Sequence, residues 1–193
     1  MMNKIIVIDN VIEKKLQDSI EKELLGINFP WFFTPDITNS KKNNNQKRPA
    51  FKHFYYNNDV VNSSYFHLIH TLMDTISEKS KIDGKLIQAR SFLQLPLNEK
   101  FTGTKLDTPH IDREIPHTVF LYYVCDGDGD TILYDYEGTE KKDFDKLKIT
   151  KRIKPKKGRV VIFNGLRWHT AEQPKNNIRC IINFNIANVN NDI

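Results

Sequence analysis

The chain has 193 residues, of which 39% are hydrophobic, and a net charge of +5. This length fits one domain with a single core, so we expect one domain over residues 1–193. No apolar run is long enough to span a membrane and the first residues lack the features of a signal peptide, which predicts a soluble, cytoplasmic protein without a membrane partner.

The cysteine content argues against a disulfide scaffold. Cys125 and Cys180 are the only two cysteines, and they lack the paired spacing of a zinc site. We expect both to be reduced and packed. The positive charge suits a polyanionic partner, but it is spread along the chain rather than gathered in one basic block, so it supports a nucleic-acid partner only weakly.

The first 84 residues are expected to form a helical support. Lys4 to Ile8 reads as a short strand, and Val11 to Leu25 carries an apolar residue at every fourth position, which predicts a helix that Asn10 caps. A second helix is predicted from Ser64 to Ser80. Its expected buried residues are Phe66, Ile69, Leu72, Met73 and Ile76.

Two segments between these helices differ in character. Phe29 to Phe33 is an aromatic cluster that we expect to pack against the core. The polar run from Asn39 to Arg48 has nothing apolar to bury, which predicts a mobile loop that substrate would order over the site described below.

From Leu86 onward the pattern changes to short β-rich segments separated by polar or glycine-containing turns. No helical period of useful length occurs there. A fold that is mainly β (α+β) follows: a double-stranded β-helix, or jelly roll, over residues 85–190, braced by the N-terminal helices. The predicted strands cover 87–95, 117–125, 131–136, 147–153, 159–164, 168–173 and 178–186.

Three residues form a candidate metal site. His110 and Asp112 are two positions apart, so in extended chain both side chains leave the same face. His169 lies in a later β-like segment that strand packing can bring back to this pair. Two histidines and one carboxylate on one face of an ion leave positions open, as oxygen-activating Fe(II) sites require.

The spacing of His110 and Asp112 is weak by itself, since chance gives such a pair in about one of two sequences of this composition. An ordered series of motifs strengthens it. After His110-x-Asp112 come Leu121-Tyr122-Tyr123, then Gly127, Gly129 and Thr131, Pro155-x-x-Gly158, Val160 to Phe163, Trp168-His169 and Arg179. Over residues 86–188 this order resembles the 2-oxoglutarate/Fe(II) dioxygenases, specifically their prolyl-hydroxylase-like branch.

The resemblance implies an oxidoreductase that uses Fe(II), 2-oxoglutarate and O₂. In that family 2-oxoglutarate is decarboxylated to succinate and CO₂, and a C–H bond of the primary substrate is hydroxylated. His110, Asp112 and His169 would be both the metal ligands and the catalytic residues. Halogenating members lack the carboxylate ligand, so the presence of Asp112 favours hydroxylation.

The resemblance also implies how the co-substrate is held. Arg179 matches the family's position for binding the far carboxylate of 2-oxoglutarate, and Tyr123 would donate its hydroxyl to the same group. Thr131 and Thr170 are further candidates. By strand alternation, Arg179 shares a face with Ile181 and Asn183, whereas Cys180, Ile182 and Phe184 share the other.

One departure from the family concerns the segment before His110. Close relatives of prolyl hydroxylases carry Tyr-x-x-Gly there, whereas residues 93–110 contain no tyrosine. The residue that contacts the iron-proximal end of 2-oxoglutarate is therefore open, and so is a prolyl substrate. The primary substrate stays open among peptides, amino acids and nucleotides, and the oligomeric state is open too.

Two alternative functions remain. A non-catalytic jelly-roll module would keep the metal ligands for binding alone and would not need Arg179. A nucleic-acid-directed oxygenase would suit the positive charge, but demethylases of that kind carry two arginines six apart after the distal histidine, and only Arg179 occurs here.

Two further patterns resemble metal sites. Asp126 to Glu137 has the acidic spacing of a calcium loop but carries Thr131 where such a loop needs glycine, so we interpret it as an acidic hairpin turn. His67 and His70, with Asp74 nearby, are interpreted as residues of a helix surface. The lysine-rich stretch from Lys141 to Arg159 is interpreted as a solvated hairpin.

Overall fold

The computed structural model describes residues 4–37, 48–98 and 105–188. Two α-helices, one 3₁₀ helix and eleven strands occur in this part of the chain. In chain order they are β1 (Ile6–Ile8), α1 (Lys14–Leu24), β2 (Phe32–Thr34), β3 (Ala50–Asn57), β4 (Val60–Val61), α2 (Phe66–Ser80), β5 (Gly84–Gln94), β6 (His117–Tyr123), β7 (Thr131–Glu137), η1 (Phe144–Lys146), β8 (Ile149–Ile153), β9 (Val160–Asn164), β10 (Arg167–Ala171) and β11 (Arg179–Asn188).

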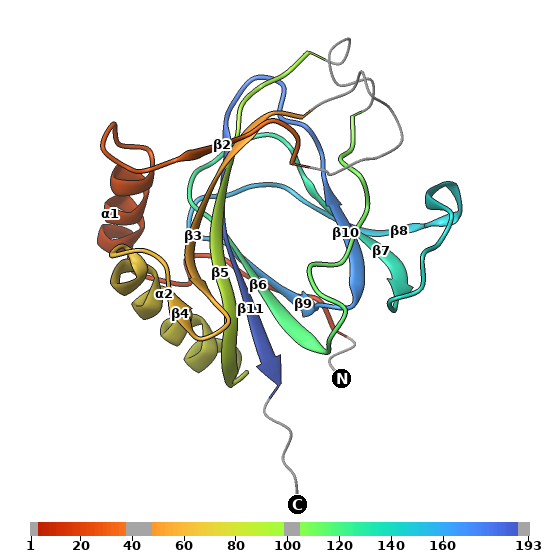
Figure 1. Ribbon diagram of the computed structural model, residues 1–193, viewed down its shortest axis with the longest axis horizontal. Coiled ribbons are helices and arrows are strands. Elements are labelled where there is room, and N and C mark those ends of the chain that lie inside the picture. The colour runs from red at the N-terminus through yellow and green to blue at the C-terminus, as the bar shows by residue number, and fades with distance from the viewer. Residues whose placement is uncertain (1–3, 38–47, 99–104, 189–193) are drawn as a thin grey trace, which may run out of the picture.

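The strands form two antiparallel sheets. The larger has eight strands in the order β1-β9-β6-β11-β5-β3-β2, with β4 paired to β3, and the smaller has the order β10-β7-β8. Figure 1 shows the two helices on one side of the large sheet and β7, β8 and β10 on the other. This arrangement agrees with the predicted jelly roll braced by helices.

The helices cover the outer face of the large sheet with an apolar layer. Ile20 and Leu24 of α1 and Ile69, Leu72 and Ile76 of α2 are fully buried there, and Phe66 and Met73 pack at the edge of the layer. The apolar spacing therefore predicted the buried faces of both helices correctly. Burial of such side chains stabilises the fold by roughly 1.5–3 kcal/mol each.

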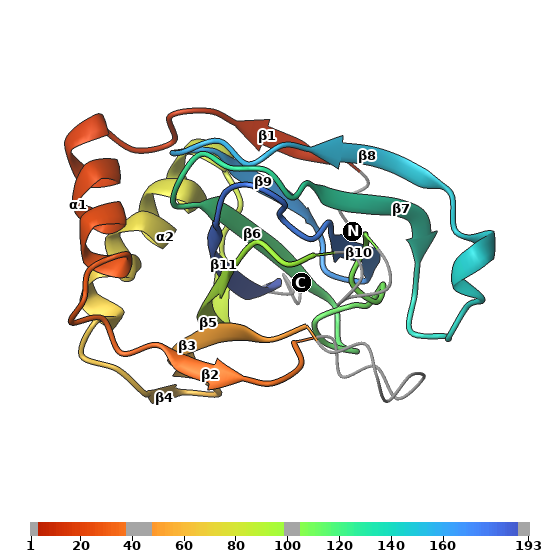
Figure 2. The ribbon, with the colours of Figure 1, turned by 90° about the horizontal axis from the view of Figure 1, so that it is seen from above.

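A second apolar cluster joins the two sheets. It combines residues of the large sheet with Leu133 and Ile153 of the small one; its large-sheet members are Val119, Leu121, Tyr123, Val161, Phe163 and Ile181. Figure 2, seen from above, shows β7, β8 and β10 on the side of the large sheet that faces away from the helices. Both faces of β6 are thus covered, and all seven of its residues are buried.

The N-terminal part contributes more than helical support. Strands β2, β3 and β4, which the sequence pattern does not predict, extend the large sheet beyond β5. Asn10 does not cap α1: the N-cap residue is Glu13, no side chain caps it, and Asn10 lies three residues earlier with φ 50°. The prediction of the cap is wrong because the chain turns at Asn10 before the helix begins.

The aromatic segment packs only in part. Phe29 is buried against Trp31, His53 and Tyr65, whereas Phe32 and Phe33 are 60% and 63% exposed on the edge strand β2. Of the predicted loop, residues 38–47 lie outside the described residues. Arg48 is described: it lies outside the helices and strands, as predicted, but its side chain is buried.

No helix in the described part of the chain is both long and apolar enough to cross a membrane.

Candidate metal centre

The two predicted histidine ligands lie opposite each other as an antiparallel backbone pair. His110 N–H donates to the carbonyl of His169 at 2.9 Å, and His169 N–H donates to the carbonyl of His110 at 3.0 Å. Residues paired in this way project their side chains in the same direction. Strand pairing therefore brings together two imidazoles that are 59 residues apart in sequence.

Both imidazoles are oriented by backbone carbonyls. Nδ1 of His110 lies 3.0 Å from the carbonyl of Thr108, and Nδ1 of His169 lies 3.1 Å from the carbonyl of Arg167. A carbonyl only accepts, so each Nδ1 carries the proton and each Nε2 keeps its lone pair. Two free Nε2 lone pairs are what a metal ion binds.

The Asp112 carboxylate is held by three donors. Nη2 of Arg90 donates to Oδ1 at 2.5 Å, while the side-chain amides of Asn183 and Asn185 donate to Oδ2 at 3.0 Å and 3.2 Å. All three donors come from β5 and β11 of the large sheet. The carboxylate is thus fixed in one orientation, with Oδ1 toward the histidines.

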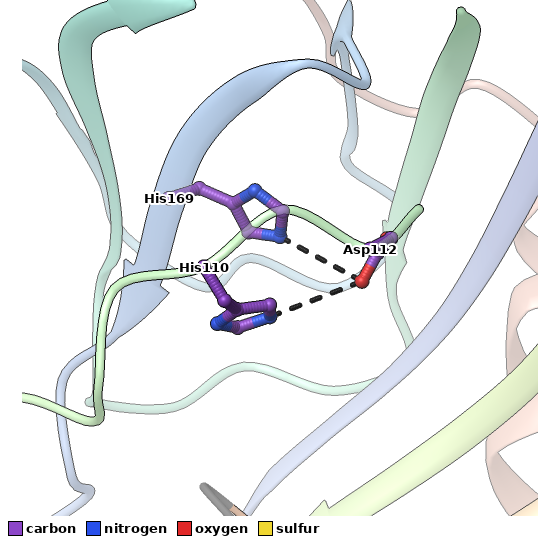
Figure 3. Close-up of side chains that lie close together, drawn as sticks. All are labelled: His110, Asp112 and His169. Carbon is purple, nitrogen blue, oxygen red and sulfur yellow. Dashed lines mark ion pairs between the residues drawn. The ribbon is translucent and has the colours of Figure 1, made fainter. Parts of the chain in front are cut away.

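The three side chains converge on one point. Oδ1 of Asp112 lies 3.8 Å from Nε2 of His110 and 4.0 Å from Nε2 of His169, as Figure 3 shows. Within residues 4–37, 48–98 and 105–188 they form the only group of three histidine, cysteine or acidic residues with donor atoms close enough to share an ion. Asp112 and His169 are buried, and His110 is half exposed.

The charge states suit a cation. Burial lowers the pKa of His169 to about 4, helped by His110 and opposed by Asp112, so the ring is neutral at physiological pH. Burial alone would raise the pKa of Asp112, but the positive charge of Arg90, the two histidines and the Asn183 amide hold it below its usual range. The Asp112 carboxylate is therefore anionic and the His169 ring neutral, as ligands of a cation should be.

A cavity of about 400 Å³ adjoins the triad. Residues on alternate positions of three adjacent strands line it in register. Arg90 of β5 lies opposite Asn183 of β11 and Phe54 of β3. One step along, Phe92 lies opposite Ile181 and Lys52, and one further step brings Gln94 opposite Arg179. The predicted face of β11 with Arg179, Ile181 and Asn183 is the cavity face.

Arg179 is buried at one end of this cavity, 4% exposed. Its guanidinium donates to the carbonyl of Gly129, to Oε1 of Gln94 and to Oγ1 of Thr131, at 3.0, 3.0 and 2.8 Å. Gly129 has φ +95°, which few other residues adopt, so the turn before β7 needs glycine to present this carbonyl. We call Arg179, Gln94 and Thr131 the Arg179 end.

The remaining predicted residues differ in their exposure to the cavity. Thr131 and Thr170 line it, and the Thr170 hydroxyl donates to the carbonyl of Asp107 at 2.6 Å. Tyr123 is not among the lining residues: it is fully buried behind Thr131 and donates to Oγ1 of that residue at 2.6 Å. Tyr123 therefore does not contact the cavity itself but hydrogen-bonds to Thr131, which lines it.

Sequence reasoning missed a buried polar chain behind the Arg179 end. Gln94 accepts from Arg179 through Oε1 and donates through Nε2 to Oδ2 of Asp107 at 3.0 Å. Asp107 in turn pairs with Arg48 at 2.7 Å, and all four residues are buried. Gln94 and Asp107 lie in the segment that lacks the family's tyrosine, and that absence was the only signal available.

The other metal-like patterns hold no site in the described residues. Asp128 accepts hydrogen bonds from the backbone N–H groups of Lys175, Asn176 and Asn177, so it anchors a turn. His70 pairs with Asp74 on the exposed surface of α2 at 3.0 Å. Both cysteines are free and buried, as predicted.

Comparison by sequence finds no related protein. No protein-family model matches the chain, and no curated protein matches it.

Comparison by structure finds solved oxygenases. An oxidoreductase of the 2OG-Fe(II) oxygenase family from Burkholderia pseudomallei has a TM-score of 0.68 at 8% identity, over 95% of this chain and 84% of that one. The viral collagen prolyl hydroxylase of Paramecium bursaria Chlorella virus-1, in its 2OG complex, has a TM-score of 0.56 at 16% identity, over 97% and 98% of the two chains.

A third similar structure contains a peptide. The prolyl hydroxylase of Trichoplax adhaerens, in complex with a fragment of the hypoxia inducible factor oxygen degradation domain, has a TM-score of 0.61 at 15% identity, over 96% of this chain and 84% of that one. Identities this low establish a shared fold and leave the chemistry to the site residues. The chain has the jelly-roll fold of the 2-oxoglutarate/Fe(II) oxygenases.

Proposed function

We propose that this chain is a non-haem Fe(II) oxygenase that uses 2-oxoglutarate and O₂ and hydroxylates a C–H bond of a primary substrate. The observation that carries the proposal is a single cavity with a His-Asp-His triad at one side and a buried arginine, Arg179, at the other. When bound, iron and 2-oxoglutarate supply the oxidation, with release of succinate and CO₂. The protein's own part is to ligate, orient and exclude water.

The donor set fits Fe(II). Two imidazoles and one carboxylate on one face are the ligands of non-haem iron oxygenases, and three positions stay open. The donor atoms of His110, Asp112 and His169 lie within 4.8 Å of one another, so these three residues would hold the ion after small movements of their side chains. Arg90, Asn183 and Asn185 fix the carboxylate, and of the three side chains that of His110 is the most exposed, at 51%.

The Arg179 end fits the far carboxylate of 2-oxoglutarate. Three of the five guanidinium N–H groups of Arg179 are used by Gly129, Gln94 and Thr131, so donors remain for a ligand. Arg179 and Asn183 lie four residues apart on β11, about 13 Å of extended strand, so the cation and the metal ligands contact different parts of one ligand. Thr131 accepts from both Arg179 and Tyr123, which leaves its own hydroxyl proton to donate.

The experiment is anaerobic addition of 2-oxoglutarate to the Fe(II) protein, followed through the visible charge-transfer band of a chelated keto acid. Wild type should develop the band and, with O₂, form succinate. Asp112→Ala should show neither, because a lost ligand weakens both affinity and geometry. Asp74→Ala, which removes an exposed carboxylate of α2, is the matched control and should behave as wild type.

Two outcomes would count against the proposal. Iron binding without a band in wild type would favour the non-catalytic module, and an unchanged band in Asp112→Ala would remove that residue from the site. A nucleic-acid-directed oxygenase is not favoured by any contact in the described residues.

The identity of the primary substrate would be determined by screening candidate compounds. The Trichoplax structure contains a peptide, so peptides stand beside amino acids and nucleotides as candidates. Each class would be tested for stimulation of succinate formation. We further propose one oxygenase domain over residues 1–193, and a reducing compartment such as the cytoplasm, which the free, buried Cys125 and Cys180 support.

A further inference from the structure

The cavity has a second wall besides the Arg179 end, formed by β3 and β5. Lys52 and Phe54 of β3 and Arg90 and Phe92 of β5 all line the cavity, and we call these four residues the β3–β5 wall. The register pairs Lys52 with Phe92 and Phe54 with Arg90. Cations and rings therefore alternate both along and across the two strands.

The contacts within this wall differ between its two cations. Arg90 lies with Cζ 5.1 Å from the centroid of the Phe92 ring, and its charge is engaged by Asp112 at 2.5 Å. Lys52 lies with Nζ 5.6 Å from the centroid of the Phe54 ring, and it forms no ion pair with any residue that the structure describes. Lys52 is thus a cation that lines a cavity without an acidic partner in the described chain.

The acidic groups of the cavity are already engaged. Asp107 pairs with Arg48, Asp112 with Arg90, and Asp36 accepts the backbone N–H of Arg48 at 3.4 Å. Among the residues that the structure describes, Arg48 and the lining residues together supply four cationic side chains against three acidic ones. These are Lys52, Arg90, Arg179 and Arg48, and Asp36, Asp107 and Asp112. Fe(II) and the 2-oxoglutarate dianion together would add no net charge, so an excess of one positive charge remains among these seven described side chains.

The rings of this wall are also free to take a ligand. Phe54 is only partly buried and belongs to none of the apolar clusters among the described residues. Phe92 packs at the edge of the inter-sheet cluster and keeps part of its ring at the cavity. A partly exposed ring can stack on a flat or apolar group, and a neighbouring ammonium can pair with an anion on the same ligand.

We propose that the β3–β5 wall binds the primary substrate, and that this substrate carries a carboxylate or phosphate for Lys52 next to an aromatic or other flat group for Phe54. The inference rests on the proposed function, because it takes the Arg179 end as the co-substrate site. Lys52 is one strand beyond Phe92 and two beyond Ile181, so its anion is distinct from the one that Arg179 binds. Arg90 belongs to this wall and also donates to Asp112, so the wall adjoins the metal ligands.

The test is isothermal titration with matched probes: phenylacetate against phenylacetamide, and adenosine 5′-monophosphate against adenosine. Titrations are done anaerobically with Fe(II) and excess 2-oxoglutarate, so that Arg179 is occupied, and repeated on the metal-free protein. At least one acidic probe should bind more tightly than its neutral analogue. The pair that responds distinguishes an aromatic acid from a nucleotide.

The variants assign the effect to Lys52. Lys52→Gln should weaken the acidic probe about 10- to 100-fold and leave its neutral analogue unchanged, since a hydrogen bond to a charged group is lost. Lys52→Arg should restore most of the affinity. Lys151→Gln, which removes an exposed lysine of β8 outside the cavity, is the control for net charge and should have no effect. Phe54→Leu should weaken both members of the pair a few-fold.

Three results would overturn the inference: no probe binds, acidic and neutral probes bind alike, or Lys52→Gln weakens both members of a pair equally. If the proposed function were wrong, the Fe(II) protein would show no charge-transfer band with 2-oxoglutarate, which is a different measurement from probe binding. Binding of the acidic probe to the metal-free protein does not depend on that band.

Discussion

Strands β5 and β11 have two buried faces of opposite character. On the helix side, Ala89 of β5 and Cys180, Ile182 and Phe184 of β11 are buried among apolar groups. On the cavity side, most alternate residues of the same strands are polar or charged, with Phe92 and Ile181 as the exceptions. Gln94, Arg179, Asn183 and Asn185 are buried there, and the side chain of Arg90 is 18% exposed. Alternate side chains of a strand usually point to the core on one face and to solvent on the other. In these strands one face points to the apolar core and the other to the cavity.

This difference indicates which face of the large sheet contributes to stability and which contributes to ligand binding. Apolar groups on the helix side need only a close-packed environment, while each buried polar group on the cavity side needs a partner. The chain from Arg48 through Asp107 and Gln94 to Arg179 supplies those partners. Changes on the helix side should therefore lower stability, and changes on the cavity side should lower ligand affinity.

The largest expected effect is on the helix side. Phe184→Ala removes a fully buried ring and should lower the free energy of unfolding by about 3–5 kcal/mol, measured by urea denaturation. The protein that stays folded should bind 2-oxoglutarate as wild type does. Phe33→Ala, at an exposed ring of β2, is the control and should change stability by less than about 0.5 kcal/mol. A large loss of 2-oxoglutarate affinity in folded Phe184→Ala would contradict the assignment of stability to the helix side and of binding to the cavity side.

The corresponding change on the cavity side is Arg179→Ala. It removes a buried charge-assisted partner, so 2-oxoglutarate should bind tens- to thousands-fold more weakly, or about 2–5 kcal/mol. Iron binding should survive because Arg179 is not a ligand. The measurement is the anaerobic charge-transfer titration, with Arg152→Ala at an exposed ion pair as the control. Equal affinities in wild type and Arg179→Ala would exclude Arg179 from the site.

A smaller effect is expected behind Arg179. Gln94→Leu removes the acceptor that orients the guanidinium and the donor to Asp107. Hydrogen bonds to charged groups contribute about 1.5–3 kcal/mol, so the co-substrate should bind about 10- to 100-fold more weakly in the same titration. Arg179 is retained, so the loss should not exceed that of Arg179→Ala. Wild-type affinity would show that Gln94 does not position Arg179.

The smallest effect is expected at the surface, away from both faces. Hydrogen bonds from Arg159 and Lys156 lower the pKa of Asp9 from 3.8 to about 2. A folded pKa below the unfolded value stabilises the fold above pH 3.8, and this stability is lost as the pH falls through about 2. Because Asp9 is partly exposed, the contribution is at most about 1 kcal/mol.

The measurement is the free energy of unfolding of wild type and Asp9→Asn between pH 5 and about 2. Asp9→Asn should flatten the decline at the acid end and lie below wild type at pH 5. Parallel curves would show that the ion pairs of Asp9 with Lys156 and Arg159 do not contribute to the pH dependence.

Local pattern alone was sufficient for much of the fold. Helix α2 ends at Ser80 as predicted, and the strands from β5 to β11 agree with the predicted segments to within a few residues. Alternation along the strand by itself predicts that Arg179 and Ile182 lie on opposite faces of β11. These features depend on the repeat of the backbone, which each segment carries in its own residues.

Tertiary structure decided which polar residues are buried together. Arg48 follows a polar run and reads as a loop residue, yet it pairs with Asp107, 59 residues later in the chain. Gln94 and Arg179 are joined across 85 residues, and β3 gains its place through pairing with β5 rather than from a clear repeat of its own. The sequence determines the type of each side chain and, by alternation along a strand, which face of the sheet it lies on. The partners that compensate a buried charge are determined only by the register between strands.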